Sequence, residues 1–394
     1  MPEKTVYLDY AAATPMDPRI LEVMLPYFNG RFGNASSMHA SGRRAAQAIA
    51  EAKDTVARVL ACAPEEIIFT GSGTESDNLA LLGAARANRA RGRHIIVSAI
   101  EHKAVLEAAT QLEREGFEIS IAPVLESGLL DLLEFKRLLR DDTILVSIMY
   151  ANNEIGTIEP LATIAALIKK HRGQRQFPLL HTDACQAAGF LSLDVTLLGV
   201  DLMTLNGSKI YGPKGVGILY KKNGVLLEPV IVGGEQEQGL RAGTESVPLI
   251  VGCAAALLLA DESKDAESAR QKGLRDYFID RMRATVPEAR LNGHQEQRLP
   301  NNAHFSFPHI EGESILLMLD RLGVEASTGS ACSARDLRPS HVLLALGQNA
   351  ELAHGSIRFS LGRYTTRDEL DYCLSILPDI VSRLNSLSAL TATL

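Results

Sequence analysis

The sequence lacks the cysteine patterns that bind zinc or build a disulfide framework. Its five cysteines are an odd number, they are scattered singly along 394 residues, and no C-x-x-C motif occurs. Thiols distributed in this way are typical of a reducing compartment. We therefore expect no metal site, no disulfide and a cytoplasmic protein, with each cysteine, taken alone, packed as a small buried side chain.

The sequence also has no long hydrophobic run and no basic run. Its longest apolar segment, residues 247–260, is too short to span a bilayer and predicts a buried helix. Residues 1–4 lead directly into a strand-like segment at 6–8, so we expect no signal peptide. The net charge is −7 and the pI is about 5.9. These values argue against nucleic acid or an anionic membrane as a partner.

Hydrophobic residues make up 46% and charged residues 22% of the chain, which is typical of a globular enzyme with room for two domains. Short apolar runs alternate with segments of helical periodicity. They predict strands at 66–70, 94–99, 117–124, 143–150, 179–184 and 200–205, and helices at 18–28, 41–60, 103–115, 131–140 and 161–171. This alternation indicates an α/β fold with a largely parallel sheet, whose ligands bind beyond the carboxyl ends of the strands.

After the helix expected at 247–260, charge density rises and the alternation loosens. The remaining segments predict strands at 303–307 and 356–360 and helices at 313–322 and 366–384. We interpret them as a second, smaller α+β domain that begins near residue 261.

A lysine follows the apolar run at 200–205, where the turn from Asn206 to Ser208 presents Lys209. A lysine among small apolar neighbours loses its proton more easily, and the free amine can form a Schiff base with a carbonyl group. An ordinary surface lysine would fit the same turn. The stretch alone does not separate Lys209 from Lys214.

The segment from Gly71 through Gly73 to Thr74 joins a predicted strand to a predicted helix. Free backbone N–H groups and the helix dipole make such a junction a phosphate cradle. It matches neither the P-loop motif nor G-x-G-x-x-G, so a nucleotide is not implied. A glycine-rich turn with Thr74 as the helix cap is the alternative.

Two more polar residues follow predicted strands. His102 could stack on a flat cofactor or move protons, or it could be a hydrogen-bonded loop histidine. Asp183 could face a protonated pyridine nitrogen, with Gln186 donating to a ring hydroxyl, or it could cap a helix.

Taken together, Thr74, His102, Asp183 and Lys209 offer a phosphate cradle, a stacking ring, a carboxylate and an amine, each just after a predicted strand. One cofactor requires all four of these groups. The sequence therefore predicts a site for pyridoxal 5'-phosphate.

Nine stretches of this sequence resemble the NifS/IscS-type cysteine desulfurases of the class V aminotransferase family, and the resemblance covers nearly the whole chain. They are Tyr7-Leu-Asp-Tyr10, Phe32-Gly-Asn34, Thr74-Glu-Ser-Asp-Asn78, Glu101-His-Lys-Ala-Val105, Asn152-Asn-Glu-Ile-Gly156, Lys209-Ile-Tyr-Gly-Pro-Lys-Gly215, Arg241-Ala-Gly-Thr244, Gly329-Ser-Ala-Cys332 and Ser356-Ile-Arg-Phe-Ser-Leu-Gly-Arg363.

The resemblance implies a fold-type I pyridoxal-phosphate enzyme that forms a homodimer with active sites at the subunit interface. It implies a large cofactor domain, residues 16–260, with a mostly parallel seven-stranded sheet flanked by helices. The smaller domain would comprise residues 1–15 and 261–394 and carry the catalytic cysteine on a loop at about 325–338.

The resemblance also implies roles for individual residues. Lys209 would carry the Schiff base, Asp183 would face the pyridine nitrogen, and His102 would lie on the ring face. Gln186 and Asn153 would lie on the 3-hydroxyl side.

The phosphate would be held by small polar residues: Gly73, Thr74, Asn206 and Ser208, with Thr244 reaching in from the partner subunit. Arg358, with Asn34, would grip the substrate carboxylate, because a guanidinium fork binds both oxygens at once. For Arg358 alone, a surface salt bridge is the alternative.

Cys332 lies in a run of small residues, 326–335, which has no large apolar side chains that could anchor it in a core. We expect this segment to be mobile and Cys332 to be a reactive thiol rather than a buried structural one. By resemblance, Cys332 would take sulfur from L-cysteine as a persulfide, leave L-alanine, and pass the sulfur to an iron–sulfur scaffold or a tRNA-thiolation relay.

The sequence departs from the resemblance at Ser208, where the family has histidine before the lysine. A serine hydroxyl can still bond phosphate, but the imidazole's donor and its charge are lost. A second departure is residues 172–178, which look longer than the family's usual link and predict a surface loop. Alternative functions are a selenocysteine lyase, a non-catalytic accessory protein on the same fold and, least favoured, an ordinary aminotransferase.

Overall fold

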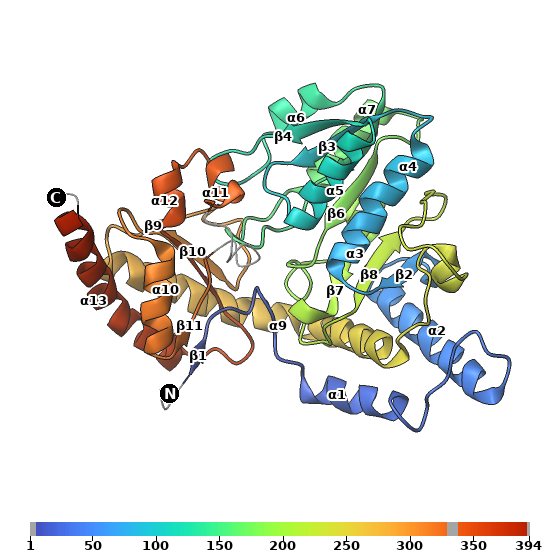
Figure 1. The fold of residues 1–394 in the computed structure, drawn as a ribbon, viewed down its shortest axis with the longest axis horizontal. Coiled ribbons are helices and arrows are strands. Elements are labelled where there is room, and N and C mark those ends of the chain that lie inside the picture. The colour runs from blue at the N-terminus through green and yellow to red at the C-terminus, as the bar shows by residue number, and fades with distance from the viewer. Residues whose placement is uncertain (1–4, 329–337, 392–394) are drawn as a thin grey trace.

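The structure is a computed structural model that describes residues 5–328 and 338–391 (Figure 1). Its centre is a seven-stranded sheet in the order β2-β8-β7-β6-β5-β3-β4. The strands are β2 (Ile67–Thr70), β3 (His94–Ser98), β4 (Glu118–Ala122), β5 (Thr143–Ser147), β6 (Leu179–Asp183), β7 (Leu202–Asn206) and β8 (Gly217–Lys221). All neighbours are parallel except at β8, which runs antiparallel to both β7 and β2. The prediction of a mostly parallel seven-stranded sheet is confirmed.

Helices cover both faces of this sheet. The helices of this part of the chain are α1 (Pro18–Met24), α2 (Ala40–Leu60), α3 (Gly73–Asn78), α4 (Ala84–Asn88), α5 (Lys103–Arg114), α6 (Leu132–Leu138), α7 (Leu161–Arg172) and α8 (Val195–Leu198). A π-helical turn, η3 (Leu79–Gly83), joins α3 to α4, and the 3-10 turn η1 (Leu25–Tyr27) follows α1.

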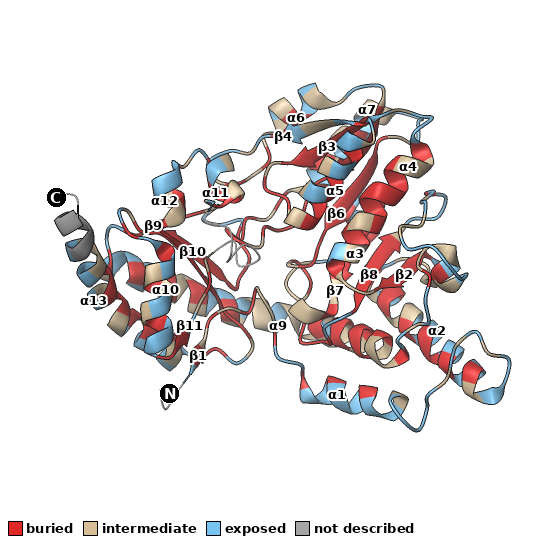
Figure 2. Ribbon diagram, viewed as in Figure 1, coloured by how far each residue is buried: buried red, intermediate tan, exposed pale blue. Residues whose placement is uncertain are grey.

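Neighbouring residues of one strand enter different apolar cores. In β3, Ile96 packs in the core with α2 and α7, whereas Ile95 and Val97 pack in the core with α5. Successive strand side chains point to opposite faces, so a sheet covered on both sides needs apolar residues at nearly every position. Figure 2 shows the resulting pattern, with buried strands at the centre and helices exposed on their outer faces.

The long helix α9 (Val247–Thr285) connects the sheet core to a second core. The sequence analysis placed the end of this helix at residue 260, which is wrong: the helix continues for a further 25 residues. Its first half packs Cys253 and Leu257 into the sheet core, and its second half packs Phe278 and Met282 into the other core. The predicted domain boundary near residue 261 therefore lies inside a continuous helix, and the division into two domains stays a prediction.

The second core is built on two small sheets. One has the order β12-β10-β9 and the other pairs β1 with β11 in parallel. The elements are β1 (Val6–Tyr7), β9 (Arg290–Leu291), β10 (Asn302–Ser306), β11 (Val324–Glu325), β12 (Ser356–Ser360), α10 (Gly312–Arg321), α11 (His341–Ala345), α12 (Ala350–His354) and α13 (Arg367–Thr391). Val6 and Leu8 are buried with this core, so the first residues described pack with the last third of the chain. Among the described residues, no helix is both long enough and apolar enough to cross a membrane.

Candidate active site

A cavity of about 530 Å³ opens at the carboxyl ends of the sheet strands, where an α/β sheet binds its ligands. Most of the residues that the sequence analysis singled out line it. They are Gly73, Thr74, His102, Asn153, Asp183, Gln186, Asn206, Ser208, Lys209 and Arg358.

Lys209 lies in a 3-10 turn, η4 (Gly207–Lys209), directly after β7. Its Nζ donates to the carbonyl oxygens of Ala11 at 2.8 Å and Ala12 at 2.6 Å. Lys214 also borders the cavity, but it is exposed at the rim, whereas Lys209 is half-buried. The structure thus separates the two lysines that the local sequence left equivalent.

Asp183 is the last residue of β6 and is 8% exposed. Its Oδ1 accepts a hydrogen bond from the backbone N–H of Cys185 at 2.9 Å. The residues that follow form turns, so Asp183 closes an Asx-type turn and does not cap a helix. Gln186 in this turn donates from Nε2 to Ala11 O at 3.0 Å.

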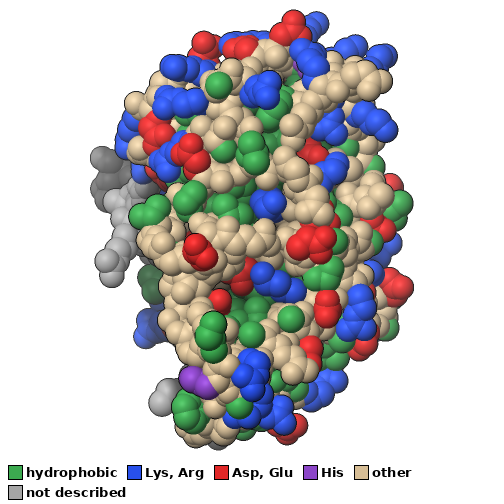
Figure 3. All heavy atoms as spheres, turned by 90° about the vertical axis from the view of Figure 1, so that its right-hand side faces the viewer, with side chains coloured by type: hydrophobic (Ala, Val, Ile, Leu, Met, Phe, Trp, Pro, Cys, Tyr) green, Lys and Arg blue, Asp and Glu red, His purple; other side chains and the backbone are tan. Residues whose placement is uncertain are grey.

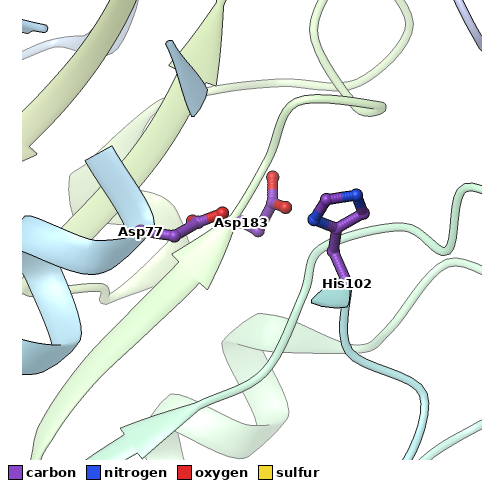
Figure 4. Close-up of side chains that lie close together, drawn as sticks. All are labelled: Asp77, His102 and Asp183. Atoms are coloured by element: carbon purple, nitrogen blue, oxygen red, sulfur yellow. The ribbon is translucent and has the colours of Figure 1, made fainter. Parts of the chain in front are cut away.

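His102 caps the N-terminus of α5, and its Nδ1 accepts from the backbone N–H of Ala104 at 3.1 Å. Because Nδ1 accepts, the neutral ring carries its proton on Nε2. Figure 4 shows Asp183 between this imidazole and Asp77, whose carboxyl group points toward it from α3. One ligand atom from each of the three residues lies within 4.8 Å of the others.

Two buried carboxyl groups in and near the cavity were not predicted from the sequence. Asp77 and Glu101 are fully buried, and burial, followed by the nearby charge of Asp183 for Asp77, raises the pKa of both carboxyl groups well above the usual range. Burial lowers the pKa of His181 in β6 to about 4, so this imidazole is uncharged at neutral pH. These buried groups therefore place no positive charge beside Asp183.

The start of α3 lies against the end of β7. Ser72 is the N-cap of α3, accepting from Glu75 N at 3.1 Å, so the alternative in which Thr74 caps this helix is wrong. Ser208 Oγ donates to Asn206 Oδ1 at 3.0 Å. A Cβ added at Gly73 would lie 3.0 Å from both Asn206 Nδ2 and Cys185 Sγ. The N-terminal backbone of the helix is thus held close to the turn that carries Lys209.

Arg358 occupies the middle of β12 and is 2% exposed, so the alternative of a surface salt bridge is wrong. Its Nη1 donates to Asn153 O and its Nη2 to Asp9 Oδ1, both at 2.8 Å. Its Nε has no hydrogen-bond partner among the described residues. A buried guanidinium at a cavity wall with donor capacity to spare is suited to binding a ligand carboxylate.

Two of the predicted residues, Asn34 and Thr244, do not join this cluster. Asn34 is exposed on the loop before α2, where its Oδ1 accepts from Ser36 N, and Thr244 is also exposed. Neither lines the cavity. Cys332 lies outside the described residues, as does most of the loop predicted at 325–338, so the roles of all three stay predictions.

The described residues on either side of that loop contact the site. Ser327 exchanges two backbone hydrogen bonds with Arg358, at 2.7 and 3.2 Å. On the other side, Ser340 Oγ donates to Glu154 at 2.5 Å and His341 Nε2 donates to the carbonyl oxygen of Glu101 at 2.9 Å. Ser327 and Ser340, which lie on either side of residues 329–337, therefore both contact residues of the cavity wall.

The sequence analysis missed Asp9, Asp77 and Glu101 as members of the site. All three stand inside stretches that carry the family resemblance, and that position is the signal that could have found them. Asp77 points into the protein from a helix, and Asp9 pairs with Arg358, which is almost 350 positions away in the sequence. No local pattern therefore indicates either role.

The donor set fits pyridoxal phosphate. Asp183, which lines the cavity, suits a protonated ring nitrogen, and Lys209 supplies an amine. A metal ion could also be held by Asp77, His102 and Asp183. The amine and the helix N-terminus in the same cavity favour the phosphorylated aldehyde, since a metal ion uses neither.

Comparison with known proteins agrees with this arrangement. Residues 6–373 match a family model described as aminotransferase class-V. The cysteine desulfurase IscS of Dictyoglomus turgidum is 49% identical over 386 residues, which cover 98% of this chain and 97% of that protein. The cysteine desulfurase IscS 1 of Archaeoglobus fulgidus is 45% identical over 384 residues, covering 98% and 99%.

Solved structures give the same result. A NifS-like protein superposes with a TM-score of 0.90 at 38% identity, covering 96% of this chain and 100% of that one. A structure of SspA in complex with cysteine superposes with a TM-score of 0.80 at 34% identity, covering 92% and 100%.

Proposed function

Because this chain belongs to the class V aminotransferase family, as a NifS/IscS-type cysteine desulfurase, we propose that it takes sulfur from L-cysteine and leaves L-alanine. The observation that carries the proposal is the cavity in which Lys209, Asp183 and Arg358 meet. These are an amine, a carboxylate at the floor and a guanidinium at the wall. One of the similar solved structures holds cysteine, which supports this choice of substrate.

Pyridoxal phosphate would be held by the residues already described around the cavity. Lys209 would hold its carbonyl carbon, Asp183 its ring nitrogen, His102 its ring face, and the start of α3 its phosphate. Ser208, although it replaces the family histidine, lines the cavity with its hydroxyl. When bound, the cofactor supplies an electron sink for the negative charge that develops at the substrate's α-carbon.

The chain's own residues perform the remaining tasks. Arg358 binds and orients the substrate carboxylate, for which the pairing with Asp9 and Asn153 O prepositions the guanidinium plane. Lys209 acts as the general base that removes the α-proton, and the carbonyl oxygens of Ala11 and Ala12 fix its amine beside the cavity.

Sulfur transfer is assigned to Cys332. Its thiolate attacks the substrate sulfur and an S–S bond forms as the C–S bond breaks. The β-carbon then takes up a proton, and Lys209 returns the proton to the α-carbon to give alanine. The persulfide on Cys332 then passes to an acceptor protein, such as an iron–sulfur scaffold or a thiolation relay, in the cytoplasm. The anchoring of Ser327 and Ser340 at the cavity wall supports a role for the intervening segment at this site.

Replacing Cys332 with serine tests the assignment. The variant C332S should keep the visible absorption of the bound cofactor but lose sulfide release from cysteine, and its mass should show no persulfide. The matched control is C62S, because Cys62 is half-buried and does not line the cavity. Full sulfide release by C332S contradicts the proposal. If C332S loses activity with cysteine but keeps activity with selenocysteine, the result supports a cysteine desulfurase over a selenocysteine lyase.

We also propose that the protein is a homodimer with Thr244 completing the partner's site. Six exposed large hydrophobic side chains lie between residues 21 and 38: Leu21, Val23, Leu25, Phe28, Phe32 and Met38. Figure 3 looks onto the side of the molecule that lies at the right in Figure 1 and shows hydrophobic side chains among charged ones across its middle. The concentration of these exposed apolar side chains in one short segment supports an interface there. Sedimentation of the purified protein as a monomer would contradict this.

A further inference from the structure

Asp77 is a buried acid in the lining of the cavity, and the proposed mechanism does not use it. It lies on α3, is 1% exposed, and directs its carboxyl group toward Asp183 (Figure 4). Its Oδ1 accepts no hydrogen bond from any described residue. A buried carboxylate with an unpartnered oxygen is costly, so its charge state needs an explanation.

Most of the groups packed around Asp77 are acids or neutral side chains. From β6 come Asp183 and His181, whose Nε2 lies 3.7 Å from Asp77 Oδ1. His181 is neutral, and its two ring nitrogens contact the hydroxyl groups of Ser147 at 2.8 Å and Thr204 at 3.1 Å. Glu101 adds a further buried acid after β3. A ring atom of His102 also comes within 4.8 Å of Asp77, but Asp183 lies between the two side chains (Figure 4).

Two acids this close cannot both be ionised cheaply when they are buried. Ligand oxygens of Asp77 and Asp183 lie within 4.8 Å of each other. In such pairs one carboxyl group keeps its proton. Asp183 is the better site for the charge, because its Oδ1 accepts the backbone N–H of Cys185, whereas Oδ1 of Asp77 accepts no hydrogen bond from a described residue. The proton then belongs on Asp77, which lacks a donor at Oδ1.

We propose that Asp77 is a positioning residue that works as a neutral carboxylic acid. Its proton is directed to Asp183, so that one negative charge, held in one orientation, faces the ring nitrogen of the cofactor. The inference rests on the proposed function, because only a cationic ring gives this single charge a purpose. Asp77 acts by positioning Asp183 and does not contact the reacting atoms.

The charge state is tested by infrared spectroscopy on the purified wild-type protein and on D77N at neutral pH. Asparagine keeps the shape of aspartic acid and cannot ionise. We expect D77N to lose one carbonyl band of a protonated carboxyl group, while Glu101 and other buried acids contribute equally to both spectra. Loss of a carboxylate band instead would mean that Asp77 is ionised, and it would overturn the proposal.

The positioning role is tested by cofactor binding to D77N and D77L. Asparagine retains a donor toward Asp183 and leucine does not. We expect D77N to bind pyridoxal phosphate within about three-fold of the wild type, and D77L to bind about ten-fold or more weakly, since a hydrogen bond to a charged group is lost. Equal weakening in both variants, or unchanged binding in D77L, would overturn the proposal.

The variant D183N separates this inference from the proposed function. If the cofactor ring lies against Asp183, D183N weakens cofactor binding strongly. Unchanged binding in D183N would refute the cofactor placement, while the infrared comparison would still decide the charge state of Asp77. A folded D77N with wild-type absorption and a weakened D77L would support both.

Discussion

At the scale of single residues, one short segment near the N-terminus holds the groups on which the proposed reaction depends. The carbonyl oxygens of Ala11 and Ala12 accept from Lys209, and Asp9 pairs with Arg358. The base and the carboxylate-binding group are therefore positioned by neighbouring residues of the same strand-to-loop segment. A shift of this segment would move both groups together.

Arg358 should determine the affinity for substrate more than the affinity for the cofactor. We expect R358K to raise the KM for cysteine about 10- to 100-fold, because a lysine cannot make two parallel hydrogen bonds to a carboxylate. The visible absorption of the bound cofactor should stay unchanged. Steady-state kinetics and cofactor spectra measure the two effects.

The control for this prediction is R321K, because Arg321 is exposed at the end of α10. It should have wild-type KM. A wild-type KM in R358K, or a loss of the cofactor together with the rise in KM, would show that Arg358 does not bind the substrate carboxylate.

The residues that the sequence predicted and those it missed differ in what determines their role. Lys209 follows a strand and Asp183 ends one, and the position of a strand end can be read from local apolar runs. Asp77 and Asp9 have roles set by partners on other elements: Asp183 for the first and Arg358 for the second. Contacts of this kind depend on the packed fold, so sequence alone indicated only the motifs that contain them.

At the scale of elements, the contact between α3 and the end of β7 shapes the phosphate side of the site. A Cβ at Gly73 would lie 3.0 Å from Asn206 Nδ2 and Cys185 Sγ. We expect G73A to separate the helix start from the Lys209 turn, to cost about 1–3 kcal/mol of stability through overpacking, and to weaken cofactor binding. Thermal unfolding and cofactor titration measure these changes.

The chain offers a matched control in α9. Gly273 is exposed in the helix interior, and an added Cβ would meet nothing within 4 Å. G273A should therefore leave cofactor binding unchanged and stabilise the protein by about 0.5–1 kcal/mol, since alanine favours helix more than glycine does. If G73A behaves like G273A, close packing at Gly73 is not required.

Element boundaries show where local sequence patterns stop being informative. Strands β3 and β5 to β7 were predicted because parallel strands buried on both faces are nearly continuous apolar runs, whereas the edge strand β4 alternates apolar and polar residues. Helix α9 was cut short because its apolar stripe changes from the sheet core to the second core, with charged residues between them. Strand β8 was missed because it starts at Gly217 in a glycine-rich stretch, and its place is set by antiparallel pairing with β7 and β2.

At the scale of the whole molecule, buried acids make stability depend on pH. Glu159 is 1% exposed, and burial raises the pKa of its carboxyl group to about 8. Its Oε2 accepts from Leu130 N at 3.0 Å, and its Oε1 has no partner among the described residues. The folded protein therefore holds Glu159 protonated at a pH where the unfolded chain has released that proton.

The sign of the effect follows from this difference. A raised folded-state pKa gives stability that is fully present below the unfolded value of 4.5 and is lost as the pH rises through about 8. Compared with E159Q, the wild type should lose up to about 1.4 kcal/mol of unfolding free energy per pH unit across this window, and nothing further above it. Denaturant unfolding of both proteins from pH 4.5 to 9 measures the difference.

Because Glu101 and Asp77 shift stability in the same direction in both proteins, only the difference between wild type and E159Q reports on Glu159. E107Q, at an exposed position on α5, should follow the wild type. A wild-type profile parallel to that of E159Q would mean that Glu159 is ionised in the folded protein.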